Sequence, residues 1–121
     1  MTRFGLPRSA RLGRASEITA LLREGRRQRM PHLDVYAAPS PAGRPRLGVI
    51  VGRHRQTAVA RNRLKRRLRE IGRLEVLPRL REAGCAADVL LRARPEAYAA
   101  GFRTLRGEVL AALERLWSRV C

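Results

Sequence analysis

The side chains in this sequence that could do chemistry are mostly arginines, and they are concentrated in one segment. Residues 58–73 read AVARNRLKRRLREIGR and hold seven basic residues against one acid, Glu70. A guanidinium can fork onto a phosphate with two parallel hydrogen bonds and can stack on a base. The segment therefore favours contact with a polyanion over the alternative of a solvated helix surface. Lys65 is the only lysine in the sequence. A GC-rich genome would give the same preference for arginine over lysine, so that preference alone does not indicate a function.

The same segment has the apolar spacing of an amphipathic helix. Ala60, Leu64 and Leu68 follow one another at intervals of four, and Ile71 comes three residues later. All four side chains therefore lie on one side of an α-helix. The basic residues and Asn62 occupy its flanks and back, where such a dense cationic face repels itself unless a polyanion covers it. The sequence thus predicts a helix that buries a narrow stripe and exposes a nucleic-acid-binding face, with Thr57 as the N-cap.

Charge extends this interpretation to the whole chain. The 121 residues carry a formal net charge of +17 and have a sequence pI near 11.9. That is far beyond what solubility requires and is typical of a protein that binds nucleic acid. Apolar residues make up 45% of the chain, enough for one modest core at this length. We expect a single domain over residues 1–121, with residues 1–14 as a basic, partly flexible N-terminal arm.

Catalytic and metal-binding arrangements are missing from the sequence. The acids are scattered singly, no serine sits in a nucleophile-elbow setting, and His32 and His54 are isolated, so neither hydrolytic machinery nor a metal site is expected. Cys85 and Cys121 are far apart and have no C-x-x-C motif, so we expect free thiols in a reducing compartment. No apolar run approaches the ~20 residues that cross a bilayer, and we expect a cytoplasmic protein.

Periodicity and breakers place the other elements around the basic helix. The expected elements are a helix over residues 16–24 capped by Ser16, strands over 32–38, 46–52 and 87–93, and a last helix opened by Pro95 or starting near Gly101. The first two strands are joined by a Pro/Gly-rich hairpin loop, and the second is apolar enough for a central strand. The fold class is α+β, a two-layer sandwich of order α-β-β-α-β-α, with helices on one face of a small mixed sheet. Phe102 and Trp117 are expected in the core rather than as binding platforms.

Arg61-Asn62-Arg63 followed by Leu64-Lys65-Arg66 resembles the RNR-x-K-R signature of the bacterial ribonuclease P protein family. The resemblance covers nearly the whole chain. It includes Arg11-Leu12 before a short helix, the strand Leu47–Val51, the lead-in Ala58-Val59, and a strand near residue 90 before a terminal helix. A lone RNR would be weak, but in this order, at this length and charge, the likeness is strong.

The resemblance implies a single RNA-binding domain that assists a catalytic RNA. In the family, the RNA with Mg²⁺ removes the 5′ leader of precursor tRNA, and the protein supplies no catalytic side chain, binds no metal tightly and requires no protein partner. The residues expected to contact the RNA subunit are Arg61, Asn62, Arg63, Lys65, Arg66 and Arg69. The residues expected to hold the single-stranded leader, in a cleft between the first helix and the sheet, are Ile18, Leu22, Leu33, Tyr36 and Arg53. A left-handed β-α-β crossover at the basic helix is also implied.

Departures from the family pattern concern base stacking. The family often has Phe where this chain has Ile18 and Leu33, which leaves Tyr36 as the expected platform for a base. Loss of a stacking partner costs about 1–3 kcal/mol per base, so leader binding is expected to be weaker or more electrostatic. Gly52-Arg53 replaces a Ser-Lys pair and keeps its charge, whereas Gln56-Thr57 replaces a Gly-Asn pair and alters the turn.

Two other classes of protein share the charge. A ribosomal or ribosome-assembly protein of similar α+β build would need no leader cleft, and a general nucleic-acid chaperone would show no preference for a structured RNA. Stimulation of 5′ cleavage by a catalytic ribonuclease P RNA at low Mg²⁺ separates the first interpretation from both alternatives.

Overall fold

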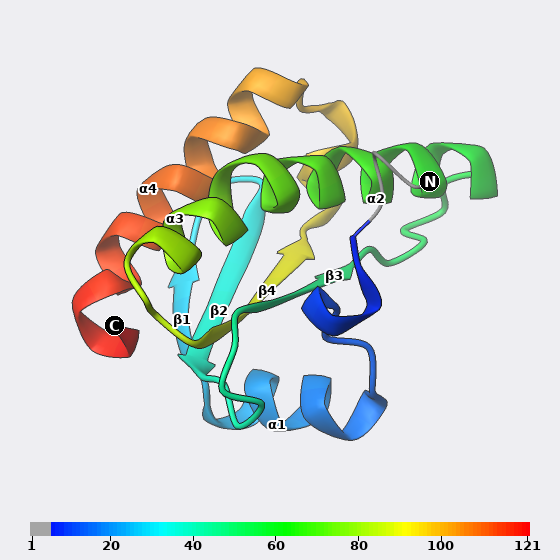
Figure 1. The fold of residues 1–121 in the computed structure, drawn as a ribbon. Helices are drawn as coiled ribbons and strands as arrows, with labels where there is room; N and C mark the ends of the chain where they lie inside the picture. The colour runs from blue at the N-terminus through cyan, green and yellow to red at the C-terminus, as the bar shows by residue number, and fades with distance from the viewer. Residues whose placement is uncertain (1–5) are drawn as a thin grey trace.

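The computed structural model describes residues 6–121. A four-stranded sheet lies between two layers of helices (Figure 1). The helices are α1 (Ala15–Glu24), α2 (Ala58–Ile71), α3 (Leu77–Glu82) and α4 (Phe102–Val120), with short helical segments η1 (Arg8–Ala10), η2 (Gly72–Val76) and η3 (Pro95–Ala99). The strands are β1 (Arg26–Arg29), β2 (Leu33–Pro39), β3 (Arg46–Ile50) and β4 (Ala87–Ala93). The α+β class with a mixed sheet is confirmed. Within the described residues, no helix is both long and apolar enough to cross a membrane.

Helix α2 forms where the periodicity predicts it. Thr57 is the N-cap, and its hydroxyl accepts a hydrogen bond of 3.0 Å from the backbone N–H of Ala60, which satisfies one of the free donors of the first turn. Its buried side chains are Leu64, Leu68 and Ile71. The helix continues through η2, a turn of π-helix, into α3. The connector after the basic helix is therefore helical throughout.

Gly72 lets α2 pack closely on β3. A Cβ atom at this position would lie 2.0 Å from Cδ2 of Leu47, so any side chain here would have to displace the buried Leu47 side chain. The absence of a side chain thus fixes how near the basic helix lies to the sheet.

The sheet differs from the prediction in strand number and order. Its order is β1-β2-β4-β3, in which β3 and β4 are parallel and the other pairs antiparallel. The sequence does not predict β1, because its residues RRQR lack apolar alternation. Strand β4 is central, and the loop from β2 to β3 is not a hairpin because β4 lies between them. Strand β3 is apolar although it is an edge strand, because α2 covers Leu47 and a bridge to Arg11 covers its outer edge.

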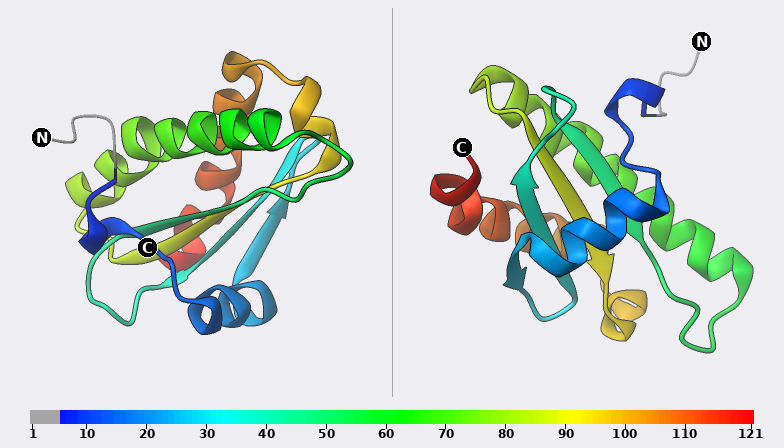
Figure 2. Two further views of the ribbon diagram at one scale, coloured as in Figure 1. Left: turned by 90° about the vertical axis from the view of Figure 1, so that its right-hand side faces the viewer. Right: turned by 90° about the horizontal axis from the view of Figure 1, so that it is seen from below.

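The connection β3–α2–β4 is left-handed, as the resemblance implies. In the right-hand view of Figure 2, α2 lies behind the sheet, both strands run downward, and β4 lies to the left of β3. Turning that view over about a horizontal axis brings α2 to the front with the strands pointing up and β4 still on the left. Parallel strands are joined in the opposite sense in almost all proteins.

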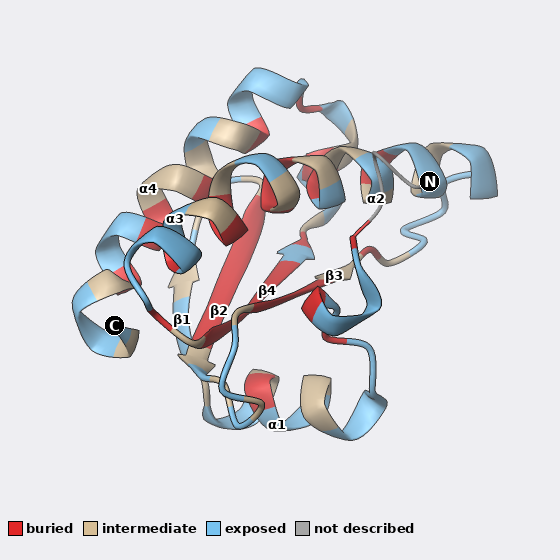
Figure 3. Ribbon diagram, viewed as in Figure 1, coloured by how far each residue is buried: buried red, intermediate tan, exposed pale blue. Residues whose placement is uncertain are grey.

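Different helices cover the two faces of the sheet (Figures 2 and 3). On one face α2, α3 and α4 pack on side chains that include Leu33 and Val35. On the other face α1 packs on Tyr36 and Leu90, so the prediction of helices on one face is wrong for α1. The side chains of strand β2 alternate between the two faces, but most are buried on both sides, because each face has its own helical cover. Helix α1 begins at Ala15, and no side chain caps it.

The N-terminal segment is part of the packed fold from residue 6 onward. Leu6, Ala10 and Leu12 are buried, and the Leu12 backbone N–H donates a hydrogen bond of 2.9 Å to the Leu47 carbonyl oxygen. The expected flexible arm therefore does not describe residues 6–14. Residues 1–5 of that arm lie outside the described part of the chain.

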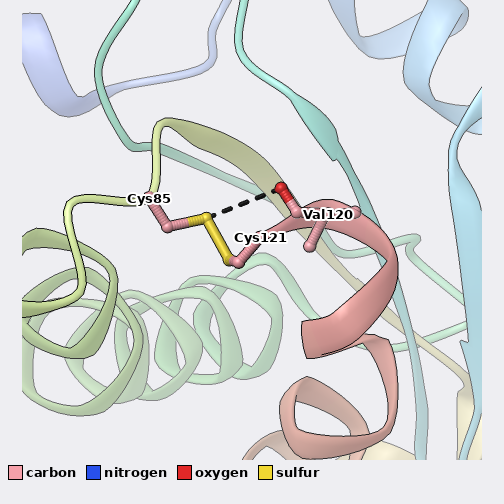
Figure 4. The surroundings of a disulfide bond; sticks show 3 residues. All are labelled: Cys85, Val120 and Cys121. Carbon is pink, nitrogen blue, oxygen red and sulfur yellow. Dashed lines mark hydrogen bonds between the residues drawn. A yellow bond between two sulfur atoms is a disulfide. The ribbon is translucent and has the colours of Figure 1, made fainter.

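Cys85 and Cys121 form a disulfide, so the prediction of free thiols is wrong (Figure 4). Their Cα atoms are 5.4 Å apart although 36 residues separate them in sequence. Cys85 follows the turn at Gly84, where φ is +65°, and α4 runs back across the sheet so that its C-terminal end meets this turn. The Cys85 sulfur also lies 3.6 Å from the carbonyl oxygen of Val120. Packing of α4 thus creates the pair, and sequence spacing does not reveal it.

Candidate nucleic-acid interface

Helix α2 has exposed positions along its length (Figure 3), and several of its basic residues are among them. Of the six residues predicted to contact an RNA subunit, Asn62, Arg63, Arg66 and Arg69 are exposed and Arg61 and Lys65 are half-buried. A depression of about 780 Å³ follows the helix and extends from Leu6 and Arg11 to Phe102 at the start of α4. The structure therefore gathers five of the six predicted contacts around one concave surface, and Arg61 lies next to it on the same helix.

Very little negative charge compensates this surface. Within residues 6–121, none of the six predicted contact residues forms an ion pair or a side-chain hydrogen bond, and Nε of Arg61 is buried without a partner. The acid on the depression is Glu70, which receives hydrogen bonds of 3.0 and 2.9 Å from Arg73. That bond raises the pKa of Arg73 above its ordinary value. The depression thus has excess positive charge, and phosphate groups are the ligands it suits.

The loop before α2 adds a second concave site at the start of the helix. A pocket of about 190 Å³ is lined by Arg53, Gln56, Thr57, Ala58 and Arg61. His54 and Arg55 have φ angles of 44° and 63°, a left-handed conformation that non-glycine residues rarely adopt. The hydroxyl of Tyr98 donates a hydrogen bond of 2.6 Å to the Gly52 carbonyl oxygen and anchors the loop. Arg53, predicted as a leader contact, thus lies beside Arg61, a predicted RNA-subunit contact.

The predicted leader residues do not all lie on one surface. Ile18 and Leu22 of α1 are half-buried and pack around Tyr36, as a cleft between α1 and the sheet requires. Leu33 is fully buried under α2 and α4 on the opposite face of the sheet. Side chains of a strand alternate between faces, so positions 33 and 36 cannot share one. The assignment of Leu33 to the cleft is therefore wrong.

Tyr36 offers little surface for a base. Only 5% of the residue is exposed, and the Arg27 guanidinium lies 6.0 Å from its ring centroid. Arg27 also donates a hydrogen bond of 3.0 Å to Asp34, two residue pairs along the sheet from Tyr36. Register places Arg92 opposite Asp34, and Arg92 is exposed. The sequence does not identify Arg27 or Arg92 as neighbours of this cleft, because the strand β1 and the strand register cannot be inferred from it.

A buried ion-pair network holds α1 on the sheet. Arg46 donates hydrogen bonds of 2.9 and 2.8 Å to Asp88 and one of 2.9 Å to Glu17 of α1. The hydrogen bond to Asp88, together with Glu17, raises the pKa of Arg46 above its ordinary value. This arginine stays charged at any pH the protein meets and is not available to a ligand.

The remaining chemistry-bearing residues have structural partners. The His32 ring is hydrogen-bonded through Nδ1 to Glu108, and the same carboxylate accepts a hydrogen bond of 2.9 Å from the His32 backbone N–H. These bonds join the β1–β2 turn to α4. Within residues 6–121, no three His, Cys, Asp or Glu side chains are grouped so that they could hold a metal ion.

The two large aromatic side chains of α4 differ in environment. Trp117 packs against the core, as predicted. Phe102 is 38% exposed and lines the depression beside α2, so its assignment to the core is wrong. Residues 102–104, at the start of α4, are all exposed.

Comparison with known proteins identifies the family. Residues 6–117 match the family model "Ribonuclease P". The chain is 41% identical over 115 residues to the ribonuclease P protein component of Acidothermus cellulolyticus, covering 92% of this chain and 91% of that protein. It is 38% identical over 122 residues to that of Desulfovibrio desulfuricans, covering 96% and 89%. The fold is similar to the solved ribonuclease P protein of Thermotoga maritima, with a TM-score of 0.68, 27% identity, and 87% and 96% of the two chains covered. The chain belongs to the ribonuclease P protein family.

Proposed function

We propose that this chain is the protein subunit of a ribonuclease P that matures the 5′ ends of tRNAs. It binds the catalytic RNA and the 5′ leader of precursor tRNA, and the RNA does the Mg²⁺-dependent hydrolysis. The observation that supports this most directly is the exposed face of α2, where basic side chains without ion-pair partners line a concave surface. Family membership supports RNA as the ligand of that surface.

Contact with the RNA subunit is assigned to α2. Its Arg61, Asn62, Arg63, Lys65, Arg66 and Arg69 present guanidinium, ammonium and amide donors along one helix. Fixed on a rigid, capped helix, these donors match a folded RNA whose phosphates are fixed as well. The arginines bind phosphates in pairs of hydrogen bonds, and Asn62 can bind a base edge or a ribose hydroxyl.

The leader is assigned to the cleft between α1 and the sheet. Leu33 is left out of the proposed contacts, because it is buried on the opposite face of the sheet. Ile18, Leu22 and the edge of Tyr36 supply apolar contact, and Arg53 and the exposed Arg92 supply charge at the ends of β3 and β4. The small exposed area of Tyr36 limits stacking. Leader binding in this chain is accordingly dominated by backbone contacts, which carry little sequence preference.

Catalysis is assigned to the RNA subunit. The protein supplies no catalytic side chain, Mg²⁺ is held mainly by the RNA, and the protein binds no metal tightly. The partners are the catalytic RNA and precursor tRNA, with no membrane and no further protein required, and the proposed location is the cytoplasm.

Reconstitution tests this function. The full chain is added to a bacterial catalytic ribonuclease P RNA and a precursor tRNA at low Mg²⁺, and cleavage at the 5′ end is followed on a gel. We expect faster cleavage at the mature 5′ end than with the RNA alone. If the cleavage rate is unchanged and the protein binds ribosomal RNA as tightly as it binds the catalytic RNA, the result would instead support a ribosome-assembly protein.

A further inference from the structure

Phe102 is an exposed aromatic side chain on a surface that is otherwise charged. It is the first residue of α4, and it is 38% exposed. Among the aromatic residues of the described chain, it is the one whose side chain lies open to solvent, because Tyr36 is buried and Tyr98 and Trp117 are half-buried. Helix α4 begins beside α2 (Figure 1), so the ring belongs to the surface of the basic helix and not to the leader cleft.

Cations without ion-pair partners line the same depression as this ring. Phe102 lines the same depression as Arg63 and Arg67, which follow one another at one turn along the flank of α2. Within residues 6–121 neither arginine forms an ion pair, and the nearby acid Glu70 is already bonded to Arg73. The ring is therefore an apolar surface at the edge of a strongly positive one.

The packing of this fold leaves Phe102 only partly covered. The core side of the same helix is formed by Leu105 and Val109, which are fully buried. Phe102 lies three and seven residues before them, on the same side of the helix, but it is the first residue of α4 and is 38% exposed. A protein partner would need both an apolar pocket for the ring and carboxylates placed against the guanidiniums of the same depression. A nucleotide supplies both an aromatic face for the ring and a phosphate for the arginines.

We propose that Phe102 is a stacking platform for an unpaired base of the RNA subunit, whose flanking phosphates bind Arg63 and Arg67. This inference rests on the proposed function and extends the RNA-subunit surface from α2 to the first residue of α4. It also relocates the stacking contact of this chain. Where Tyr36 has 5% of its surface exposed in the leader cleft, Phe102 has 38% exposed beside the RNA-subunit face.

Fluorescence tests whether a base covers this position. The chain has a single tryptophan, Trp117, near the other end of α4. A Phe102→Trp, Trp117→Phe protein therefore reports on position 102, and the wild-type protein reports on position 117. When a bacterial catalytic ribonuclease P RNA is added, we expect quenched emission and protection from acrylamide at position 102 only. Unchanged emission and full acrylamide access at position 102 in the RNA-bound protein would overturn the proposal.

Affinity gives an independent test with a matched control. Stacking on an aromatic side chain is worth about 1–3 kcal/mol per base, so Phe102→Ala should weaken binding to the RNA about 5- to 150-fold. Phe102→Tyr should keep most of the affinity, and Leu110→Ala, on the same helix but lining a different cavity, should bind as the wild type does. The salt dependence should not change in any of them, because no charge is removed. Equal affinity of Phe102→Ala and wild type would reject the platform.

The outcomes separate this inference from the function on which it rests. If the wild-type chain neither binds the RNA nor stimulates cleavage, the proposed function fails. If the wild type does both and Phe102→Ala matches it in affinity, only the platform fails. A thermal melt of each variant by circular dichroism identifies any loss of affinity that comes from unfolding.

Discussion

At the scale of single residues, ion pairing separates the arginines into two groups with different roles. Arg46 is buried and bonded to Asp88 and Glu17, and it holds α1 on the sheet. Arg63 and Arg66 are exposed on α2 and form no ion pair within residues 6–121. Charge counts alone cannot make this distinction, because it depends on which acids the fold brings near. We therefore assign the candidate interface to the arginines without ion-pair partners, and not to the total charge of +17.

Ile18 offers a direct test of the leader cleft at the same scale. Because Ile18 is half-buried beside Tyr36, Ile18→Phe adds aromatic surface where the leader is proposed to lie. Stacking of about 1–3 kcal/mol per base should then tighten binding of leader-bearing precursor tRNA about fivefold or more. Affinity for mature tRNA should stay the same. Both are measured as dissociation constants of the reconstituted holoenzyme.

Leu33→Phe is the control for that substitution. Leu33 is fully buried on the opposite face, so the larger ring should destabilise the fold by about 1–3 kcal/mol without tighter leader binding. Tighter binding from Leu33→Phe, or none from Ile18→Phe, would show that the cleft is placed on the wrong face.

At the scale of elements, local signals decide what the sequence predicts. Helix α2 is predictable because its apolar seam and the Thr57 cap are both local. Strand β1 is missed because RRQR has no apolar side chain, and it forms only because β2 supplies a partner. The apolar run of β3 suggests a central strand, yet contacts from α2 and the N-terminal segment account for it. Leu33 is assigned to the leader cleft from the resemblance alone. Alternation of side chains along β2 instead places it on the other face of the sheet from Tyr36.

The disulfide joins two elements and makes a prediction at this scale. Cys85 and Cys121 close a loop with a sequence separation of 36, which corresponds to about 3–4 kcal/mol of stability from loop entropy. Cys121→Ser should therefore lower the free energy of unfolding by that amount in oxidising buffer. With dithiothreitol present, the mutant and the wild type should be equal. Urea unfolding followed by circular dichroism measures both differences.

Ser118→Ala, near the same end of α4, is the control for that experiment. It leaves the disulfide intact and should unfold as the wild type does under both conditions. A reducing cytoplasm would disfavour the bond, so the stability gain belongs to the oxidised protein. If wild type and Cys121→Ser have the same stability in oxidising buffer, the two cysteines do not form this bond in solution.

At the scale of the whole molecule, one sheet separates the two surfaces that we propose bind RNA. Helix α2 offers an arginine-lined depression on one side, and on the other side α1 packs over an apolar cluster that includes Tyr36. The left-handed connection from β3 through α2 to β4 determines on which face the basic helix lies. The sequence predicts the composition of each surface, but their placement depends on strand order and crossover hand, which long-range pairing alone determines.

The central claim is that the basic side chains among the predicted contact residues of α2, which form no ion pair within residues 6–121, bind the phosphates of a folded RNA. The most direct test is the slope of log K against log salt concentration for binding to a catalytic ribonuclease P RNA. We predict that Arg66→Ala weakens binding and reduces the magnitude of that slope by about one unit. Arg119→Ala, an exposed arginine in the last turn of α4, should change neither quantity. Identical slopes for wild type, Arg66→Ala and Arg119→Ala would contradict the claim.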